Sequence, residues 1–432
     1  MSISVIGAGY VGLTTAAGLA SKGYNVIIIE ADEAKVNLLN QGRAPFSEEG
    51  LGALLSDCIK VNGNLIASSD YEGISRSDIT LICVGTPSNS DGSINLSYVE
   101  DSVKGIGKVL RKKRRYHLVV VRSTVSPGTT RDVVIPLLEE YSRKRVGKNF
   151  GVAVNPEFLQ QGKALHAFLN PDRIIIGESD DKAGSMVEGI YSGCGISSPV
   201  VKTDVTTAEM IKYASNAFLA TKISFINEMG NICKQLGLDV YAVAKGISFD
   251  YRIGERFLSA GVGFGGSCLP KDLQALVYAS SNRWGYRSRL LQSVLDVNKA
   301  QAVKIVEMTE QKIGSLRNKK ITVLGLAFKP NTDDIRNAPA IRVIEMLIEG
   351  GASVRTYDPK AMSNAKQVLP KDVKFCNSAS EAINESDCVL ILTEWDEVRE
   401  LSLYTGRIVI DGRRALEPQK ARAVCDYEGI CW

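Results

Sequence analysis

One cysteine of this chain is placed where a thiol becomes reactive. Residues 261–267 are rich in glycine and lead to Cys268, and Pro270 follows at a position typical of the first turn of a helix. A helix N-terminus lowers the pKa of a thiol and favours the thiolate, the form that attacks electrophiles. The sequence therefore predicts a nucleophilic Cys268; the alternative is a buried, inert cysteine beside a crowded loop.

Four other side chains and one amide could handle charge or protons near such a nucleophile. Asp272 comes about one helical turn later, and Lys212 and Asn216 share one face of a predicted helix. Glu157 follows a predicted strand, and Thr124 ends another at the edge where doubly wound sheets bind ligands. Taken singly, Lys212 is typical of a solvated surface charge and Glu157 of an acid that starts a helix. Neither residue alone therefore indicates an active site, and only their combination with Cys268 does.

A glycine motif near the N-terminus indicates a dinucleotide site. Gly7, Gly9 and Gly12 follow a predicted strand and open a helix, which permits a tight turn and close approach of a pyrophosphate. The next strand ends in Glu30, where a carboxylate would bind an adenosine ribose and disfavour a 2′-phosphate. The sequence therefore predicts that the turn binds a dinucleotide and is not merely structural, and that this dinucleotide is NAD. Gly325, which follows a later strand, lacks the companion glycines, so we expect the second α/β unit to bind a different ligand.

Composition excludes several classes of protein. Hydrophobic residues make up 44% and charged residues 23%, and the net charge of +4 over 432 residues does not suggest nucleic-acid binding. The basic run at 111–115 is more typical of a solvated helix end than of nucleic-acid or membrane contact. No apolar run spans a bilayer and a strand begins at Ile3, so we expect a cytoplasmic protein. Two histidines and nine cysteines without a C-x-x-C pair predict no metal site.

Hydrophobic patterning predicts an α/β protein with two Rossmann-like doubly wound domains joined by a helical middle domain. We expect strands at residues 2–6, 25–30, 79–84, 118–122, 151–154 and 173–177, and a second α/β unit from residue 320. A helix of about 30 residues should begin with the capping box Thr206/Glu209 and stop at Gly237. The predicted domains are 1–197, 198–300 and 315–432, and the long central helix suggests a homodimer.

The two ends of the chain also resemble each other. Residues 77–82 and 386–391 both begin Ser-Asp and continue as an apolar strand, and each α/β unit opens with a strand, a glycine and a helix. We interpret the ends as related folds; chance similarity between two buried strands is the alternative.

At this point the motifs resemble a known family, the UDP-glucose/GDP-mannose dehydrogenases, in order and spacing over essentially the whole chain. The matching segments are residues 7–12, 85–87, 122–125, 155–159, 212–216, 263–272, 328–329 and 411–414. The resemblance implies a four-electron oxidation of a sugar nucleotide's primary alcohol to a carboxylate, using two NAD. An aldehyde would be captured by Cys268 as a thiohemiacetal, oxidised to a thioester and hydrolysed.

The same resemblance assigns roles to individual residues. Lys212 and Asn216 would stabilise the oxyanion, Asp272 would position Lys212 or a water, Glu157 would assist hydrolysis and Thr124 would hold the water network. The residues implied for NAD are Gly7, Gly9, Tyr10, Val11, Gly12, Glu30, Lys35, Thr86, Thr124, Gln161 and Arg336. Those implied for the sugar nucleotide are Glu157, Phe158, Leu159, Lys212, Asn216, Arg252, Phe257, Phe264, Gly265, Phe328, Lys329 and Arg413.

Two of these positions carry particular expectations. Arg252 matches an arginine that reaches into the partner subunit's site in the family. Gln161 stands where the family commonly has a glutamate, so its contact with the cofactor loses a charge. The resemblance favours UDP-glucose as substrate, because residues 249–254 and 257–264 look like the UDP-glucose branch of the family. GDP-mannose is the first alternative. A UDP-hexosamine is a further one, although Ser267 precedes the cysteine where hexosamine enzymes usually have histidine.

Two other classes of protein remain as alternatives. A Rossmann-type protein that senses nucleotides without turnover would explain the glycine motif but not the Cys268 loop. A two-electron hydroxyacid dehydrogenase would have no need of the thiol.

Overall fold

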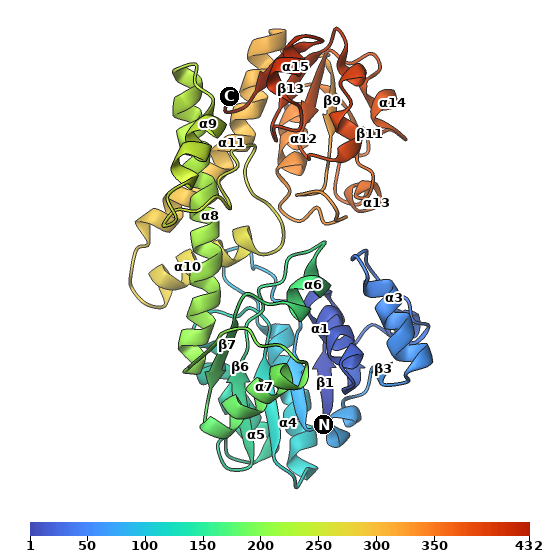
Figure 1. Ribbon diagram of the computed structural model, residues 1–432, viewed down its shortest axis with the longest axis vertical. Helices are drawn as coiled ribbons and strands as arrows, with labels where there is room; N and C mark the ends of the chain where they lie inside the picture. The colour runs from blue at the N-terminus through green and yellow to red at the C-terminus, as the bar shows by residue number, and fades with distance from the viewer. The chain divides into compact units, whose positions relative to one another are not determined.

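The computed structural model describes residues 1–432, which divide into two compact units, residues 1–215 and 216–432 (Figure 1). Each unit contains one α/β sheet whose neighbouring strands are mainly parallel. The predicted fold class, two Rossmann-like sheets with a helical middle region, is therefore confirmed. The division into three domains at 1–197, 198–300 and 315–432 stays a prediction.

The first unit is built on an eight-stranded sheet of order β3-β2-β1-β4-β5-β6-β7-β8, parallel except between β6 and β7. Its strands are β1 (Ser2–Ile6), β2 (Asn25–Ile29), β3 (Leu65–Ser68), β4 (Ile79–Ile82), β5 (His117–Val121), β6 (Phe150–Val154), β7 (Ile174–Glu178) and β8 (Val200–Thr203). Sequence patterning misses β3 and β8. Both lie at sheet edges and are partly exposed, as at Ile66 and Val201, so neither carries a continuous apolar run.

Helices cover both faces of this sheet. They are α1 (Tyr10–Ser21), α2 (Glu33–Asn40), α3 (Leu51–Ser56), α4 (Ser97–Lys112), α5 (Ile135–Ser142), α6 (Ala164–Leu169) and α7 (Asp181–Gly193), followed by the long α8 (Val205–Gln235). Successive residues of β5 alternate between two cores: Leu118 and Val120 pack with α1, α3 and α7, whereas Val119 and Val121 pack with α4 and α5. No helix of the chain is both long and apolar enough to cross a membrane.

The start of α8 differs from the predicted capping box. Asp204, not Thr206, caps the helix, accepting the Thr206 N–H at 2.9 Å. Glu209 turns away from the helix end and accepts the backbone N–H groups of Gly128 (2.6 Å) and Thr130 (2.8 Å). The prediction was wrong because Asp204, two residues earlier, is the stronger cap, and Glu209 satisfies the donors of a neighbouring segment. Burial raises the pKa of Glu209 to about 7.

The second unit carries a six-stranded, all-parallel sheet of order β11-β10-β9-β12-β13-β14. Its strands are β9 (Lys320–Leu324), β10 (Ser353–Tyr357), β11 (Lys374–Phe375), β12 (Cys388–Ile391), β13 (Ile408–Asp411) and β14 (Asp426–Gly429). Its helices are α9 (Val240–Ser248), α10 (Leu269–Asn282), α11 (Arg289–Ile313), α12 (Pro339–Glu349), α13 (Met362–Ala365), α14 (Ala379–Ile383) and α15 (Pro418–Arg422). As predicted, α8 stops before Gly237, which has a left-handed φ of 68°.

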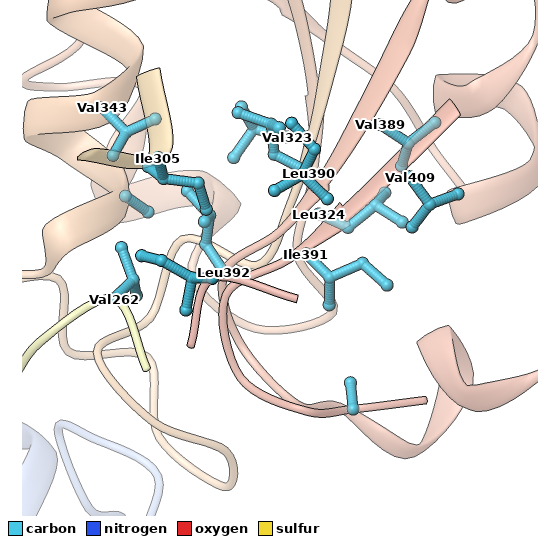
Figure 2. Packing of buried hydrophobic residues seen from close by; sticks show 14 of the residues in the cluster. Val262, Ile305, Val323, Leu324, Val343, Val389, Leu390, Ile391, Leu392 and Val409 are labelled. Carbon is cyan, nitrogen blue, oxygen red and sulfur yellow. The ribbon is translucent and has the colours of Figure 1, made fainter. Parts of the chain in front are cut away.

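One continuous hydrophobic core joins this sheet to the helices and to the glycine-rich loop. Figure 2 shows Val262 of the loop, Ile305 of α11 and Leu392 after β12 as members of that core. The loop before Cys268 is therefore packed against the hydrophobic core of the unit.

The internal similarity seen in the sequence is present in the structure. Asp78 and Asp387 both precede the fourth strand of their sheet, and each accepts a backbone N–H from the first strand, from Ser2 at 3.0 Å and Lys320 at 2.8 Å. The two sheets also share the order of their first six strands. The echo between the two ends thus reflects one topology used twice.

Candidate active site

The glycine turn after β1 has the shape that a dinucleotide requires. Gly7 has a φ of 94°, a left-handed conformation that suits glycine. A Cβ on Gly12 would lie 1.9 Å from the Gly7 carbonyl oxygen, so only glycine allows the helix to start so close to the strand. A Cβ on Gly9 would meet nothing within 4 Å, which leaves the backbone open to a ligand.

Glu30 ends β2 beside this turn. Its Oε2 accepts the backbone N–H of Ala8 at 2.8 Å and its Oε1 that of Asp32 at 3.1 Å. The carboxylate is half-buried and is held where a ribose hydroxyl is bound in dinucleotide folds. Lys35 is on α2 and also half-buried, with its Nζ 3.9 Å from an Asp32 oxygen.

Neighbouring strands bring further predicted cofactor residues to the same edge. Thr86 follows β4 and Thr124 follows β5, and the Thr86 hydroxyl donates to the Thr124 carbonyl oxygen at 2.8 Å. Tyr10 opens α1 with its ring 4.0 Å from that of Phe46, and Val11 follows. Since β1 lies next to β4, and β4 next to β5, these residues surround a sheet edge that fits NAD.

A buried ion pair follows β6. Glu157 Oε1 lies 3.3 Å from Lys212 Nζ, and both side chains are only 6% exposed. The other carboxylate oxygen accepts the Leu159 N–H at 2.5 Å. The ring of Phe158 contacts two cations, with Lys212 Nζ 5.2 Å and the Arg173 guanidinium 3.9 Å from its centroid. The structure thus brings together four residues predicted from sequence and adds Arg173.

The segment that contains Gln161 is held by a residue that sequence analysis missed. Glu48 is buried and accepts the backbone N–H groups of Gly162 (2.8 Å) and Ala164 (2.7 Å). Gln161 itself is half-buried in this segment. Glu48 gave no signal because its partners lie far away in the sequence.

Cys268 occupies the N-cap position of α10, with Pro270 in the first turn, as predicted. It is exposed, whereas the other eight cysteines are buried. Burial raises the pKa of Cys83 and of Cys388 to about 12, so neither thiol ionises readily. The position at a helix N-terminus and the exposure set Cys268 apart as the candidate nucleophile.

The loop before Cys268 is held by a set of hydrogen bonds within the second unit. The Val262 N–H donates to the Gly412 carbonyl oxygen at 2.8 Å, and the Gly261 N–H to Asn227 Oδ1 at 2.7 Å. The Asn298 side chain accepts the Phe264 N–H (2.7 Å) and donates to its carbonyl oxygen (3.0 Å). Both asparagines were missed because a single amide on a helix carries no periodic signal.

Asp272 is 1% exposed and lies one turn into α10. Its two oxygens accept from Lys271 Nζ at 2.6 Å and from Asn216 Nδ2 at 2.7 Å. Asn216 and Asp272 are therefore in direct contact. Lys271 joins this cluster and was not predicted.

A second group of residues lies around Gly265 and Gly266. A Cβ on Gly265 would be 2.4 Å from the Asn337 carbonyl oxygen, and one on Gly266 would be 2.9 Å from the Phe328 ring. Lys329 Nζ lies 5.5 Å from the same ring centroid. The Arg336 carbonyl oxygen accepts the Gly266 N–H at 2.8 Å, while its guanidinium pairs with Asp334 at 2.6 Å.

Arg413 follows β13, and its Nε lies 3.9 Å from a carboxylate oxygen of Glu394. Its Nε donates to the Leu392 carbonyl oxygen at 3.0 Å, but its Nη2 is buried without a hydrogen-bond partner. A buried guanidinium nitrogen without an acceptor is costly, and a phosphate oxygen would satisfy it.

The segment after α9 is exposed. The guanidinium of Arg252 pairs with Asp250 at 2.5 Å, and Tyr251 beside it is 92% exposed. Phe257 has a left-handed φ of 66°, which is rare for a bulky residue. Phe264, by contrast, is buried.

Models of one protein family match most of the chain. The NAD binding domain, central domain and UDP binding domain of the UDP-glucose/GDP-mannose dehydrogenase family match residues 1–194, 206–300 and 322–418. The NAD binding domain covers the glycine turn and Glu30, the central domain covers Cys268, and the UDP binding domain covers Arg413.

Individual relatives agree with these matches. The chain is 43% identical to the UDP-glucose 6-dehydrogenase AglM of Haloferax volcanii and 37% identical to a GDP-mannose 6-dehydrogenase of Pseudomonas putida, each over 100% of both chains. It is similar to the structure of a UDP-glucose dehydrogenase from Pyrobaculum islandicum, with a TM-score of 0.94, 40% identity and coverage of 100% of this chain and 98% of that one. The chain therefore belongs to the UDP-glucose/GDP-mannose dehydrogenase family of NAD-dependent nucleotide-sugar dehydrogenases.

Proposed function

We propose that this enzyme oxidises UDP-glucose to UDP-glucuronate with two molecules of NAD. The observation that carries the proposal is the exposed Cys268 at the N-cap of α10, beyond a loop that is bonded to the core. Two curated UDP-glucose 6-dehydrogenases are 43% and 42% identical to the chain, against 37% for a GDP-mannose enzyme. This difference favours UDP-glucose, with GDP-mannose the second candidate.

The reaction removes four electrons in two steps. When bound, NAD supplies the oxidising equivalent of each step by taking a hydride from the sugar carbon. The first step converts the primary alcohol into an aldehyde and releases a proton. The Cys268 thiolate then adds to the aldehyde carbon, the second oxidation turns the resulting thiohemiacetal into a thioester, and water cleaves it to give the carboxylate and free thiol.

Lys212 and Asn216 would act on the carbonyl oxygen of the sugar, which gains negative charge during the reaction. An oxyanion forms when the thiol or water adds to the carbonyl carbon, and the ammonium of Lys212 and the amide of Asn216 would stabilise it. Asp272, which already holds the Asn216 amide, would orient these donors or a water. Glu157 would assist hydrolysis of the thioester, and Thr124 would hold the water network.

The second unit would bind the nucleotide diphosphate. Arg413 and Lys329 are cations suited to phosphate oxygens, and Phe264, Gly265 and Phe328 would contact the remainder of the sugar nucleotide. The unpartnered Nη2 of Arg413 supports this assignment because a phosphate would supply the missing acceptor.

We also propose that two copies associate through α8. Phe218, Phe225 and Ile232 recur at seven-residue intervals on one face of the helix, and their exposed fractions are 65%, 48% and 49%. A stripe of this kind suits a second copy of the same helix. Arg252 would then reach the site of the partner, so Phe225→Asp should give a monomer with weakened UDP-glucose binding; a dimeric variant would contradict the interface.

The test of function is the number of NADH molecules formed per sugar nucleotide consumed. Purified enzyme should yield two NADH per UDP-glucose and little from GDP-mannose or a UDP-N-acetylhexosamine. One NADH per sugar would indicate a two-electron dehydrogenase without a thioester. No NADH from any of them would favour a nucleotide-sensing protein.

A further inference from the structure

The turn that carries Arg413 is bonded to the loop that carries the nucleophile. Asp411 accepts the backbone N–H groups of Arg413 (2.9 Å) and Leu416 (3.0 Å), which closes the turn after β13. The carbonyl oxygen of Gly412, which lies between Asp411 and Arg413, accepts the Val262 N–H at 2.8 Å. Any movement of this turn therefore moves both a candidate phosphate ligand and the start of the glycine loop.

Arg414 completes the turn in an unfavourable backbone conformation. Its φ is 50°, in the left-handed region that long side chains rarely adopt. The side chain is held on two sides. Its two terminal nitrogens bond both oxygens of Asp239, at 2.5 and 2.7 Å, and its guanidinium carbon lies 4.2 Å from the Tyr241 ring centroid and 5.6 Å from that of Trp432. A paired, stacked arginine can hold such a backbone in place.

These contacts lead to the same end of the glycine loop that Gly412 holds. Asp239 caps α9 by accepting the Tyr241 N–H at 2.9 Å, and the Tyr241 hydroxyl donates to the Ala260 carbonyl oxygen at 2.7 Å. Ala260 is the residue before the loop. The hydrogen bond from Arg414 holds the pKa of Asp239 below its usual value, so the carboxylate stays charged.

Hydrogen bonds also connect Trp432, on which Arg414 stacks, to Asp411. Trp432 Nε1 donates to the Tyr427 hydroxyl at 2.9 Å, and Tyr427 donates to Asp411 Oδ2 at 3.1 Å. Burial raises the pKa values of both Tyr427 and Asp411. Arg414 is thus in contact with α9 and with the Trp432 ring that ends this chain of hydrogen bonds.

We propose that Arg414 is a positioning residue for the nucleotide diphosphate: its ion pair with Asp239 and its stacking on Tyr241 and Trp432 hold the turn that aims Arg413 and anchors the glycine loop. The guanidinium is occupied by its own partners, so Arg414 acts through Arg413 and does not touch the ligand. The inference rests on the proposed function, because it assumes that Arg413 binds the UDP-sugar.

The test compares Arg414→Gln and Asp239→Asn with the wild-type enzyme. Asparagine still caps a helix, so Asp239→Asn removes the charge of the pair while keeping α9 capped. Each variant should weaken UDP binding in calorimetry, and raise KM for UDP-glucose, by about tenfold, with KM for NAD unchanged. The double variant should be no weaker than either single one, because both changes break the same pair. Arg145→Gln, which breaks the exposed Arg145–Glu139 pair of 2.8 Å, is the matched control and should bind UDP as the wild type does.

The outcomes separate this inference from the proposed function. UDP affinity of Arg414→Gln within twofold of the Arg145→Gln control would overturn the positioning role. Equal losses of UDP and NAD affinity would also overturn it, since they would mean a general loss of structure. A wild-type protein that neither binds UDP nor oxidises UDP-glucose would overturn the proposed function and this inference with it.

Discussion

The two sheets of this enzyme begin in the same way and end with different ligand sites. In both, a glycine follows the first strand with nearly the same left-handed φ, 94° at Gly7 and 93° at Gly325, and donates its N–H to the end of the second strand. After Gly7, helix α1 starts at Tyr10. After Gly325 the chain continues as a loop, and α12 does not start until Pro339. Only the first sheet therefore presents a helix N-terminus directly at the turn.

The acid at the end of the second strand shows the same divergence. Glu30 makes two backbone hydrogen bonds and stays half-buried. Asp358 is 1% exposed and accepts the backbone N–H groups of Leu326, Ala327, Lys360 and Ala361 and the indole N–H of Trp395. Both oxygens of the Asp358 carboxylate thus accept hydrogen bonds from the protein itself. The same position in one topology thus leaves a carboxylate partly open in the first unit, where we propose that it binds the ribose of NAD, and closes a loop in the second unit.

The glycine turn is the largest difference, so Gly12→Ala should have the largest effect. Its Cβ would lie 1.9 Å from the Gly7 oxygen, and relieving this clash must open the turn. We expect the dissociation constant of NAD to rise at least about 100-fold in calorimetry, which corresponds to roughly 3 kcal/mol. Gly9→Ala adds a Cβ that meets nothing within 4 Å, so it should keep the wild-type thermal midpoint. Wild-type NAD affinity in Gly12→Ala would contradict this account of the turn.

The Asp358→Ala variant tests whether the second acid is structural. Removing the carboxylate leaves five donors without their acceptor, and we expect the free energy of unfolding of the second unit to fall by about 3 kcal/mol in urea. KM for NAD should not change. Stability equal to that of the wild type would refute the loop-closing role.

Replacing Glu30 should give the opposite result. In Glu30→Ser we expect KM for NAD to rise about tenfold, and the preference for NAD over NADP to relax, with a small change in thermal midpoint. A variant that uses NAD as the wild type does would mean that Glu30 does not bind the ribose.

The smallest effect concerns pH, and it arises in the first sheet alone. His117 is the first residue of β5 in that sheet, with Lys113 Nζ 2.9 Å from its Nδ1 and Thr80 Oγ1 2.8 Å from its Nε2. Burial and the charge of Lys113 lower the pKa of His117 from 6.5 to about 3. At the place of Thr80, the second sheet has the apolar Val389.

The direction of the pH effect follows from this lowered pKa. Above pH 6.5 His117 is neutral in both the folded and the unfolded state, so its titration does not reduce the free energy of unfolding. As the pH falls toward 3, the unfolded chain binds a proton that the native state does not, at a cost of about 1.4 kcal/mol per pH unit. Urea midpoints between pH 7 and 5 should therefore fall less steeply in His117→Gln than in the wild type; equal slopes would exclude His117 as the cause.

Contiguous features could be predicted from the sequence. The strand Ser2–Ile6 has the predicted bounds because it is a buried apolar run that ends at the glycine turn. The glycine turn and the Cys268 loop were also found, since both chemistries need a stretch of backbone with a defined shape. The order of the strands, by contrast, required the structure.

The supporting residues could not be predicted. Glu48 holds the Gln161 segment, Asn298 the glycine loop and Asp239 the guanidinium of Arg414, and each acts on a partner distant in sequence. An isolated acid or amide gives no periodic pattern from which such a contact could be read. Edge strands β3 and β8 were missed for a similar reason, because exposure removes the apolar signal.

The central claim is that Cys268 carries the sugar through the second oxidation. Its most direct test is UDP-glucuronate formation by Cys268→Ala, measured by chromatography beside the wild-type enzyme. We predict that acid formation falls by at least about 1000-fold while UDP and NAD still bind, because the aldehyde has no thiol to capture it. Undiminished acid formation by Cys268→Ala would contradict the covalent mechanism.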